Sequence, residues 1–211
     1  MTNSDAWESI YREKGEHFKD IHEAIPRLEE TFKKYNLEKI LDLGCGTGRH
    51  VVYFAEKGFK VYGFDISTTG IDFANRKLKE RNLTADLRVW DMRKPLPYNN
   101  EFFDAIISIR VLGHGDIKTI KGIISEVERV LKPKGYVFAD MPTYEKVLRL
   151  IQQGEEFKEI EERTYEPLSG PEKGLLHHNF TREEALELFR NFDVIEFYEK
   201  DEHYNLLGRK K

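Results

Sequence analysis

The sequence predicts an α/β fold around a mostly parallel sheet, and three observations support this prediction. Short apolar runs alternate with helical patterns through the middle of the chain. A loop with three glycines follows the first apolar run. A later run, 104–109, is almost entirely apolar, as expected of a strand buried on both faces. Strands that alternate with helices form βαβ units with parallel strands and right-handed crossovers.

The expected elements follow from these patterns in chain order. Two helices come first and are predicted over 6–15 and 26–36. The parallel strands are predicted over 39–43, 59–64, 87–90, 104–109 and 135–141. The helices between these strands are predicted over 49–57, 68–81 and 116–131, with glycines after the first and the last of them.

The last third of the chain has a different pattern. A helix over 144–153 leads into 155–173, which is acidic and poor in apolar residues. Thr181 and Glu184 fit a capping box at the start of a further helix, in which Glu184 reaches back to the cap. The runs 192–198 and 203–207 predict a β-hairpin that closes the sheet edge. We expect a single domain, 1–211, with a variable segment at 142–180 whose acidic part is either a lid or a solvated excursion.

Composition excludes several kinds of protein. The 211 residues carry 34 Lys and Arg against 38 Asp and Glu, so the net charge of −4 gives no overall attraction to nucleic acids or anionic membranes. The one cysteine, Cys45, excludes an internal disulfide and a cysteine-based zinc site. No apolar run approaches the roughly 20 residues of a membrane-spanning helix. We expect a cytoplasmic monomer or homodimer with no nucleic-acid or membrane partner.

The glycine loop 42–48 is the strongest functional signal. Its glycines permit a tight turn and let a ligand approach the backbone closely. A dinucleotide-binding loop would carry a further glycine at the position of Arg49. Asp42 would repel a pyrophosphate and instead fits a ligand with an ammonium and a sulfonium group. The loop therefore predicts such a ligand, the alternative being a strand-to-helix corner that binds nothing.

Acidic residues also follow the next two predicted strands. Asp65 lies 21 residues after Gly44, a spacing that suits hydrogen bonds from both hydroxyls of a ribose. Asp91 can accept the amino group of adenine, and Met92 can pack on the ring. Ligands of open α/β sheets bind at the carboxyl ends of the strands, where these acids fall. The alternatives are a helix cap for Asp65 and a turn residue for Asp91.

The loop and these acids belong to a longer series of motifs that includes 103–108 (FDAIIS) and 130–135 (VLKPKG). As a set they resemble the successive motifs of the class I S-adenosylmethionine-dependent methyltransferases. The resemblance implies a three-layer, Rossmann-like sheet of seven strands in the order 3-2-1-4-5-7-6, the last strand antiparallel. It also implies S-adenosylmethionine as methyl donor and S-adenosylhomocysteine as product. The implied cofactor-binding residues are Tyr11, Asp42, Gly44, Cys45, Gly46, Gly48, Arg49, Asp65, Ile66, Asp91, Met92 and Ser108.

Within this superfamily the chain is most similar to the small-molecule branch that includes the TehB-like methyltransferases. This similarity rests on 48–50 (GRH) and on Trp7 and Tyr11. In that branch a Trp-x-x-x-Tyr helix commonly folds over the cofactor, so the helices within 1–36 are expected to cover the cofactor site. Ordinary helix packing is the alternative role for the two aromatic residues.

The acceptor side of the site is predicted to follow the fourth strand. His114 is the candidate general base, with a turn residue as its alternative role, and Arg110 is the candidate for binding an anionic acceptor. Tyr165 and His178 are further acceptor-side candidates. Adjacent histidines point apart on a strand, so at most one of the pair 177–178 faces the pocket. A metal site at this pair finds no third ligand, and no metal is expected.

Missing motifs narrow the acceptor. No Asn/Asp-Pro-Pro-aromatic motif follows the fourth strand, and no Pro-Cys nucleophile is present. The sequence therefore predicts an enzyme that transfers a methyl group in line to a small molecule, mainly by aligning the reactants. The alternatives are a protein or RNA methyltransferase that acts with a partner and a non-catalytic, cofactor-binding regulatory subunit. An NAD-dependent oxidoreductase is disfavoured by Arg49 and Asp42.

Overall fold

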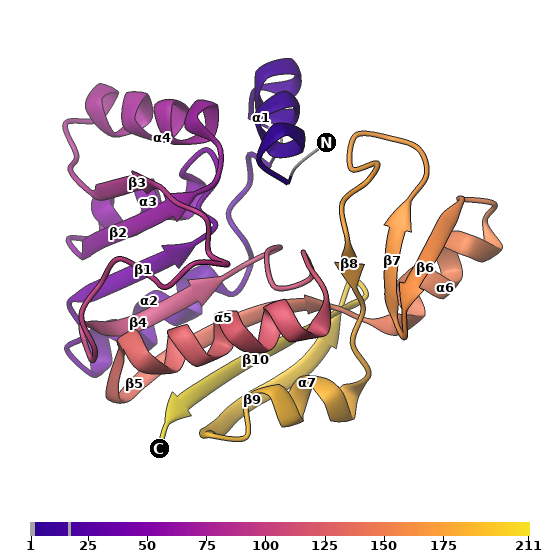
Figure 1. The fold of residues 1–211 in the computed structure, drawn as a ribbon. Coiled ribbons are helices and arrows are strands. Elements are labelled where there is room, and N and C mark those ends of the chain that lie inside the picture. The colour runs from indigo at the N-terminus through magenta and orange to yellow at the C-terminus, as the bar shows by residue number, and fades with distance from the viewer. Residues whose placement is uncertain (1–2, 17) are drawn as a thin grey trace.

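The computed structural model describes residues 3–16 and 18–211, and its centre is a seven-stranded sheet (Figure 1). The strands β1 to β5 run parallel, and β10 is antiparallel to both β5 and β9. The strands of this sheet are β1 Lys39–Leu43, β2 Lys60–Asp65, β3 Asp86–Val89, β4 Phe103–Ser108, β5 Leu131–Pro142, β9 Phe192–Lys200 and β10 His203–Lys210. Their order is β3-β2-β1-β4-β5-β10-β9, so the predicted seven-stranded order is confirmed, with β9 and β10 as the sixth and seventh strands.

Helices cover both faces of the sheet and complete three layers (Figure 1). Successive side chains of a strand point to opposite faces. Leu41 and Leu43 accordingly join an apolar cluster with residues of α5 and α7, whereas Ile40 joins a second cluster with residues of α2, α3 and α4. The helices are α1 Asn3–Lys14, α2 Ile25–Lys34, α3 Arg49–Glu56, α4 Thr68–Glu80, α5 Ile117–Val130, α6 Tyr144–Gln152 and α7 Arg182–Leu188.

A second, smaller sheet lies beside α6 at one end of the molecule (Figure 1). It consists of β6 Phe157–Glu161, β7 Thr164–Pro167 and β8 His177–His178, all antiparallel. The sequence analysis did not predict this sheet. β6 is exposed along nearly its whole length, so no alternation of apolar and polar residues marks it as a strand.

The chain returns from the small sheet to the main sheet through a few defined contacts. The backbone N–H of His178 donates to the carbonyl of Gly113 (2.8 Å), in the loop after β4. The hydroxyl of Thr181 caps α7 by accepting from the N–H of Glu184 (3.2 Å), as predicted. The predicted return bond from Glu184 is wrong, because its carboxylate binds the Arg163 guanidinium (3.1 Å) and the His178 ring (3.1 Å). Charged partners outcompete a backbone N–H for this carboxylate.

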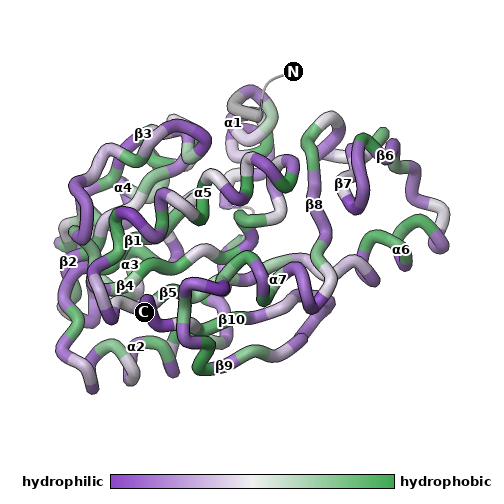
Figure 2. Tube along the Cα trace, turned by 60° about the horizontal axis from the view of Figure 1, so that its bottom comes forward, coloured by the Kyte–Doolittle hydropathy of each residue, from purple (hydrophilic) through white to green (hydrophobic). Residues whose placement is uncertain are grey.

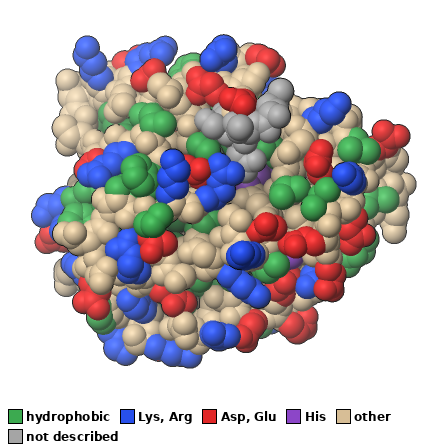
Figure 3. Space-filling model, viewed as in Figure 1, with side chains coloured by type: hydrophobic (Ala, Val, Ile, Leu, Met, Phe, Trp, Pro, Cys, Tyr) green, Lys and Arg blue, Asp and Glu red, His purple; other side chains and the backbone are tan. Residues whose placement is uncertain are grey.

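The surface carries both signs of charge. Acidic and basic side chains are interspersed over the face in Figure 3.

The apolar residues of α6, green in Figure 2, include Val147, which is buried, and Leu148 and Ile151, which are exposed. Within residues 3–16 and 18–211, none of the helices has the length and apolar character needed to cross a bilayer.

Candidate functional site

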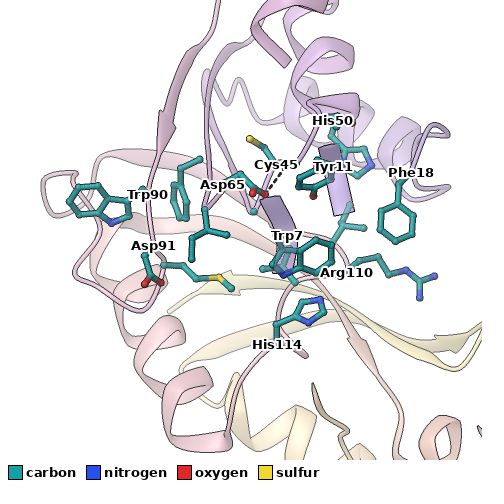
Figure 4. Close-up of a pocket in the computed structure, with 18 of the residues that line it drawn as sticks. Trp7, Tyr11, Phe18, Cys45, His50, Asp65, Trp90, Asp91, Arg110 and His114 are labelled. Atoms are coloured by element: carbon teal, nitrogen blue, oxygen red, sulfur yellow. Dashed lines mark hydrogen bonds between the residues drawn. The ribbon is translucent and has the colours of Figure 1, made fainter. Parts of the chain in front are cut away.

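Two adjoining cavities lie at the carboxyl ends of the parallel strands. The first, which we call the glycine-loop cleft, is lined by the loop after β1 together with Tyr11, Asp65 and Met92 (Figure 4). The second, the histidine cavity, is lined by Lys146 and by His114, His177 and His203, and has a volume of about 430 Å³. Four side chains line both cavities: Trp7, Phe18, Arg110 and His114. The two cavities therefore adjoin at these side chains.

The glycine loop forms the floor of the cleft. Gly44 and Gly46 have left-handed backbone conformations, with φ of 72° and 53°, which a residue with a Cβ adopts at a cost. A Cβ on Gly46 would lie 2.7 Å from the Tyr11 hydroxyl oxygen, so no other residue fits beneath this ring. The loop thus brings bare backbone up to the cleft, as a closely bound ligand requires.

Asp65 ends β2 and is held rigidly by the backbone. One carboxylate oxygen accepts from the N–H of Gly46 (Figure 4) and the other from the N–H of Ser67, both at 2.9 Å. Each oxygen keeps a free lone pair, which can accept from a ligand hydroxyl. Burial raises the pKa of Asp65 to about 6, although these backbone hydrogen bonds act in the opposite direction. The geometry suits neutral hydroxyl donors such as those of a ribose.

The far end of the cleft follows β3. Here Ile66 and Met92 contribute apolar surface, and Asp91 lies beside them. The Asp91 carboxylate accepts two hydrogen bonds from the Arg93 guanidinium (2.8 and 2.7 Å), and these bonds lower its pKa. The indole N–H of Trp90 is buried and has no hydrogen-bond partner among the described residues. An apolar slot bordered by hydrogen-bonding groups is a suitable site for a heteroaromatic ring.

Asp42 lies elsewhere than the sequence analysis expected. Because side chains alternate along β1, Asp42 points to the same face as Ile40 and packs beneath the loop, with one carboxylate oxygen 3.9 Å from the His50 Nδ1. It is not among the residues that line the cleft, and neither are Gly48 and Ser108. Burial raises the pKa of Asp42 to about 7. Burial also keeps the pKa of His50 well below its ordinary range, so this histidine is neutral and supplies no compensating charge.

The first helix packs directly on the cleft. The Glu8 carboxylate accepts from the Ser67 hydroxyl (2.6 Å) and the Thr69 N–H (3.1 Å) at the start of α4. Burial acts to raise the pKa of Glu8, but these hydrogen bonds outweigh it and lower the pKa to about 2. Trp7 and Tyr11 on the same helix lie with ring centroids 5.8 Å apart and point into the site (Figure 4). Glu8 therefore fixes the helix that carries both aromatic residues.

His114 stands where the two cavities meet. Its ring packs edge-on against Trp7 (5.0 Å between centroids) and against His177 (4.9 Å). The Nδ1 atom of His114 is buried and has no hydrogen-bond partner among the described residues. Burial lowers the pKa of His114, so the ring is neutral at neutral pH and can accept a proton.

Arg110 follows β4 and belongs to a group of polar residues that the sequence analysis did not find. Its backbone has a φ of 62°, and its N–H donates to the Asp140 carboxylate (3.3 Å) at the end of β5. Its guanidinium contacts the ring of His203 on β10, and Lys146 reaches the same ring from α6. Asp140 is further held by His22, whose Nε2 lies 3.4 Å away. No local motif marks these residues, because they come from separate parts of the chain.

Two predicted acceptor-side residues lie outside both cavities. The Tyr165 hydroxyl lies 3.5 Å from that of Tyr144, and the Tyr165 ring is buried in the small sheet. The His178 ring contacts the Thr164 hydroxyl (2.7 Å) and Glu184. Its neighbour His177 lines the histidine cavity instead, so the two adjacent rings point apart. In the part of the chain that the structure describes, no cluster of three His, Cys, Asp or Glu side chains could hold a metal ion.

Comparisons with known proteins identify the kind of protein that carries this site. Residues 40–135 match the family model described as a methyltransferase domain. A ubiquinone biosynthesis O-methyltransferase from Bartonella tribocorum is 34% identical over 100 residues, which cover 47% of this chain and 39% of that protein. The chain spans about half the length of the curated relatives that it matches.

Solved structures agree with this domain over nearly the whole chain. The PH0226 protein from Pyrococcus horikoshii matches with a TM-score of 0.76 at 23% identity, covering 96% of this chain and 99% of that one. TehB from Haemophilus influenzae matches with a TM-score of 0.67 at 22% identity, covering 97% and 67%. The chain thus contains a methyltransferase domain and has the fold of the class I S-adenosylmethionine-dependent methyltransferases. The fold predicted from the sequence is confirmed.

Proposed function

We propose that this methyltransferase fold transfers a methyl group from S-adenosylmethionine, bound in the glycine-loop cleft, to a small molecule bound in the histidine cavity. The observation that carries the proposal is that the two cavities share lining residues. Trp7, Phe18, Arg110 and His114 line both of them. A donor in one cavity and an acceptor in the other would therefore meet beside these side chains.

The residues of the cleft suit this cofactor. Asp65 offers two backbone-anchored oxygens for the ribose hydroxyls, and Ile66 and Met92 offer apolar surface for the adenine. The bare backbone at Gly44 and Gly46 suits the close approach of the amino-acid part. When bound, S-adenosylmethionine supplies an activated methyl group on its sulfonium. The chain need contribute only alignment, exclusion of water and, for a protonated acceptor, removal of a proton.

His114 is the group best placed for proton removal. It lines both cavities, and burial keeps it neutral with one ring nitrogen unpartnered. The charge that it acquires is favoured by the Glu172 carboxylate, which acts to raise the pKa of His114 and lies 3.3 Å from the neighbouring His177 ring. We assign His114 as the general base and Trp7 as a positioning residue for the acceptor.

A small-molecule acceptor fits the size of the histidine cavity. Its volume of about 430 Å³ is within the range of small-molecule pockets. A relative named as a ubiquinone biosynthesis O-methyltransferase and the shared fold of TehB support a member of the small-molecule branch. The face in Figure 3 carries interspersed acidic and basic side chains. It therefore lacks the basic patch that would favour a nucleic-acid acceptor.

The test is a labelling experiment with the purified chain. The protein is incubated with methyl-labelled S-adenosylmethionine and a cell extract separated into metabolite, RNA and protein fractions. We expect label to enter the metabolite fraction and to disappear from it with Asp65→Ala. Label in RNA or protein alone would favour an enzyme that modifies macromolecules with a partner. Cofactor binding without labelling of any fraction would favour a regulatory subunit.

A further inference from the structure

We propose that the methyl acceptor is a small acid whose anionic group binds between Arg110 and Lys146 in the histidine cavity. This inference rests on the proposed function, because it assigns the chemistry of the acceptor in that same site. The two cations come from different elements, the loop after β4 and the helix α6, and both line the cavity.

One imidazole holds the two cations together. The His203 Nδ1 lies 2.8 Å from the Asp201 carbonyl and donates to it, which leaves Nε2 as an acceptor. Lys146 Nζ lies 3.4 Å from this Nε2, and the Arg110 guanidinium contacts the same ring. Burial lowers the pKa of His203 to about 4, so the ring is neutral and brings the cations together without neutralising either.

The two cations make few ion pairs with the described residues. Asp140 is the one carboxylate of the described residues within ion-pair distance of Arg110, with 3.6 Å between its oxygen and the Arg110 Nε. In the described part of the chain, Lys146 has no carboxylate within ion-pair distance. The nearby Glu202 is instead bound to Arg149 (2.7 Å). Asp140 is thus the one ion-pair partner of the two cations among the described residues, although Glu155 and Glu172 also line the cavity. Burial and the nearby Arg110 lower the pKa of Lys146, and a bound anion would reverse that effect.

The backbone of Arg110 supports a ligand role for its side chain. A non-glycine residue with a φ of 62° costs about 1 kcal/mol, and such conformations concentrate at functional sites. The bond from its N–H to Asp140 holds the residue in this conformation and aims the guanidinium toward the histidine cavity.

The rest of the cavity describes the body of the acid. Val147, Leu150 and Phe157 line it beside Trp7, so most of the wall away from the cations is apolar or aromatic. Two cations beside apolar and aromatic side chains select a small molecule with one acidic group on an aromatic or aliphatic body. The acidic group would anchor the acceptor while another part of it reaches His114 at the junction with the cleft.

The test measures binding apart from methyl transfer. Purified protein is first titrated with S-adenosylhomocysteine and then, when saturated, with benzoate and phenyl phosphate or with their uncharged counterparts benzamide and benzyl alcohol. Tryptophan fluorescence reports binding, because Trp7 lines both cavities. We expect each acid to bind about tenfold or more tightly than its uncharged counterpart, as a charge-assisted hydrogen bond predicts.

Variants locate the anion. Lys146→Gln removes a cation that lines only the histidine cavity, so it should weaken binding of the acids about tenfold and leave the S-adenosylhomocysteine affinity unchanged. Lys146→Arg should restore binding. Lys121→Gln, on the exposed side of α5, is the matched control and should change nothing.

Each outcome decides between the two proposals. A chain that does not bind S-adenosylhomocysteine would contradict the proposed function itself. A chain that binds it, but binds the acids no more tightly than their uncharged counterparts, would overturn the inference about the acceptor alone. Acid binding that is unchanged in Lys146→Gln would overturn it as well.

Discussion

The glycine-loop cleft and the histidine cavity adjoin, yet they have different origins. Asp65 and Asp91 line the cleft, Lys146 lines the cavity, and Arg110 lines both. The cleft is formed by consecutive βα units, whose strand ends meet at one edge of the sheet. The cavity is formed by the loop after β4, α6, β8 and β10, which are brought together only by the complete fold.

This difference indicates how the two halves of the site are specified. The cofactor side depends mainly on the ends of successive parallel strands, with Trp7 and Tyr11 of α1 packed over them. The acceptor side depends on the segment 142–180, which the main sheet does not fix. Function that varies between related proteins should therefore reside in the second half.

The largest effect is expected where the two regions meet. His114→Ala should lower kcat by about 10²–10⁴-fold, the usual contribution of a general base. The affinity for S-adenosylhomocysteine should stay within a few-fold, as measured by calorimetry. Because burial lowers the pKa of His114 from its ordinary 6.5, the wild-type rate should begin to fall only at pH values below that. Equal turnover in wild type and variant would remove His114 from the mechanism.

The next effect belongs to the cleft alone. Asp65→Ala should weaken cofactor binding by about 1–3 kcal/mol, because ligand hydroxyls and two backbone N–H groups lose their acceptor. Calorimetric titration with S-adenosylhomocysteine measures this loss. Asp193→Asn, on the exposed part of β9, removes a carboxylate elsewhere and should leave the affinity unchanged. An unaltered affinity for Asp65→Ala would sink the assignment of this residue to the cofactor.

Much of the fold could be predicted from the sequence, because its local patterns agree with its topology. Every predicted strand of the main sheet is present, and alternation along β1 accounts for the two apolar clusters. The small sheet could not be predicted in this way. β6 is stabilised by pairing with β7 more than by burial, and pairing leaves no periodic pattern in the sequence.

The site could be predicted only in its first half. The role of Asp65 could be predicted because this residue ends a strand at a fixed distance from the glycine loop. The roles of Lys146 and His203 could not be predicted, because no sequence pattern marks either residue. They come together only where α6 and β10 pack beside the loop that carries Arg110. The direction of Asp42 was also beyond prediction, since it depends on which face of β1 the helix α3 covers.

A stability measurement tests the burial of the Asp42 carboxyl beneath the glycine loop. The pKa of Asp42 is about 7 in the folded chain against an ordinary value of 3.8, so its contribution to stability is present in acid and is lost as the pH rises through 7. Asparagine at position 42 cannot ionise. The free energy of unfolding of cofactor-free Asp42→Asn, relative to wild type, should therefore rise by about 1–2 kcal/mol between about pH 5 and about pH 8. Denaturant unfolding at several pH values measures this gain. A gain that does not vary with pH would contradict it, and Asp193→Asn serves as the control.

The smallest expected effect should appear in both regions at once. Glu8 anchors α1 on the start of α4, and Trp7 on the same helix lines both cavities. Glu8→Gln keeps a hydrogen-bond acceptor but removes the charge that favours a helix N-terminus, so it should cost about 0.5–1 kcal/mol. The loss should be shared by S-adenosylhomocysteine and by benzoate, unlike that of Asp65→Ala or Lys146→Gln, each of which affects one ligand. Glu13→Gln on the same helix should alter neither affinity, since among the described residues Glu13 accepts a hydrogen bond only from the Ser9 hydroxyl at the surface. If Glu8→Gln weakened only one of the two ligands, α1 would belong to one region and would not couple the two.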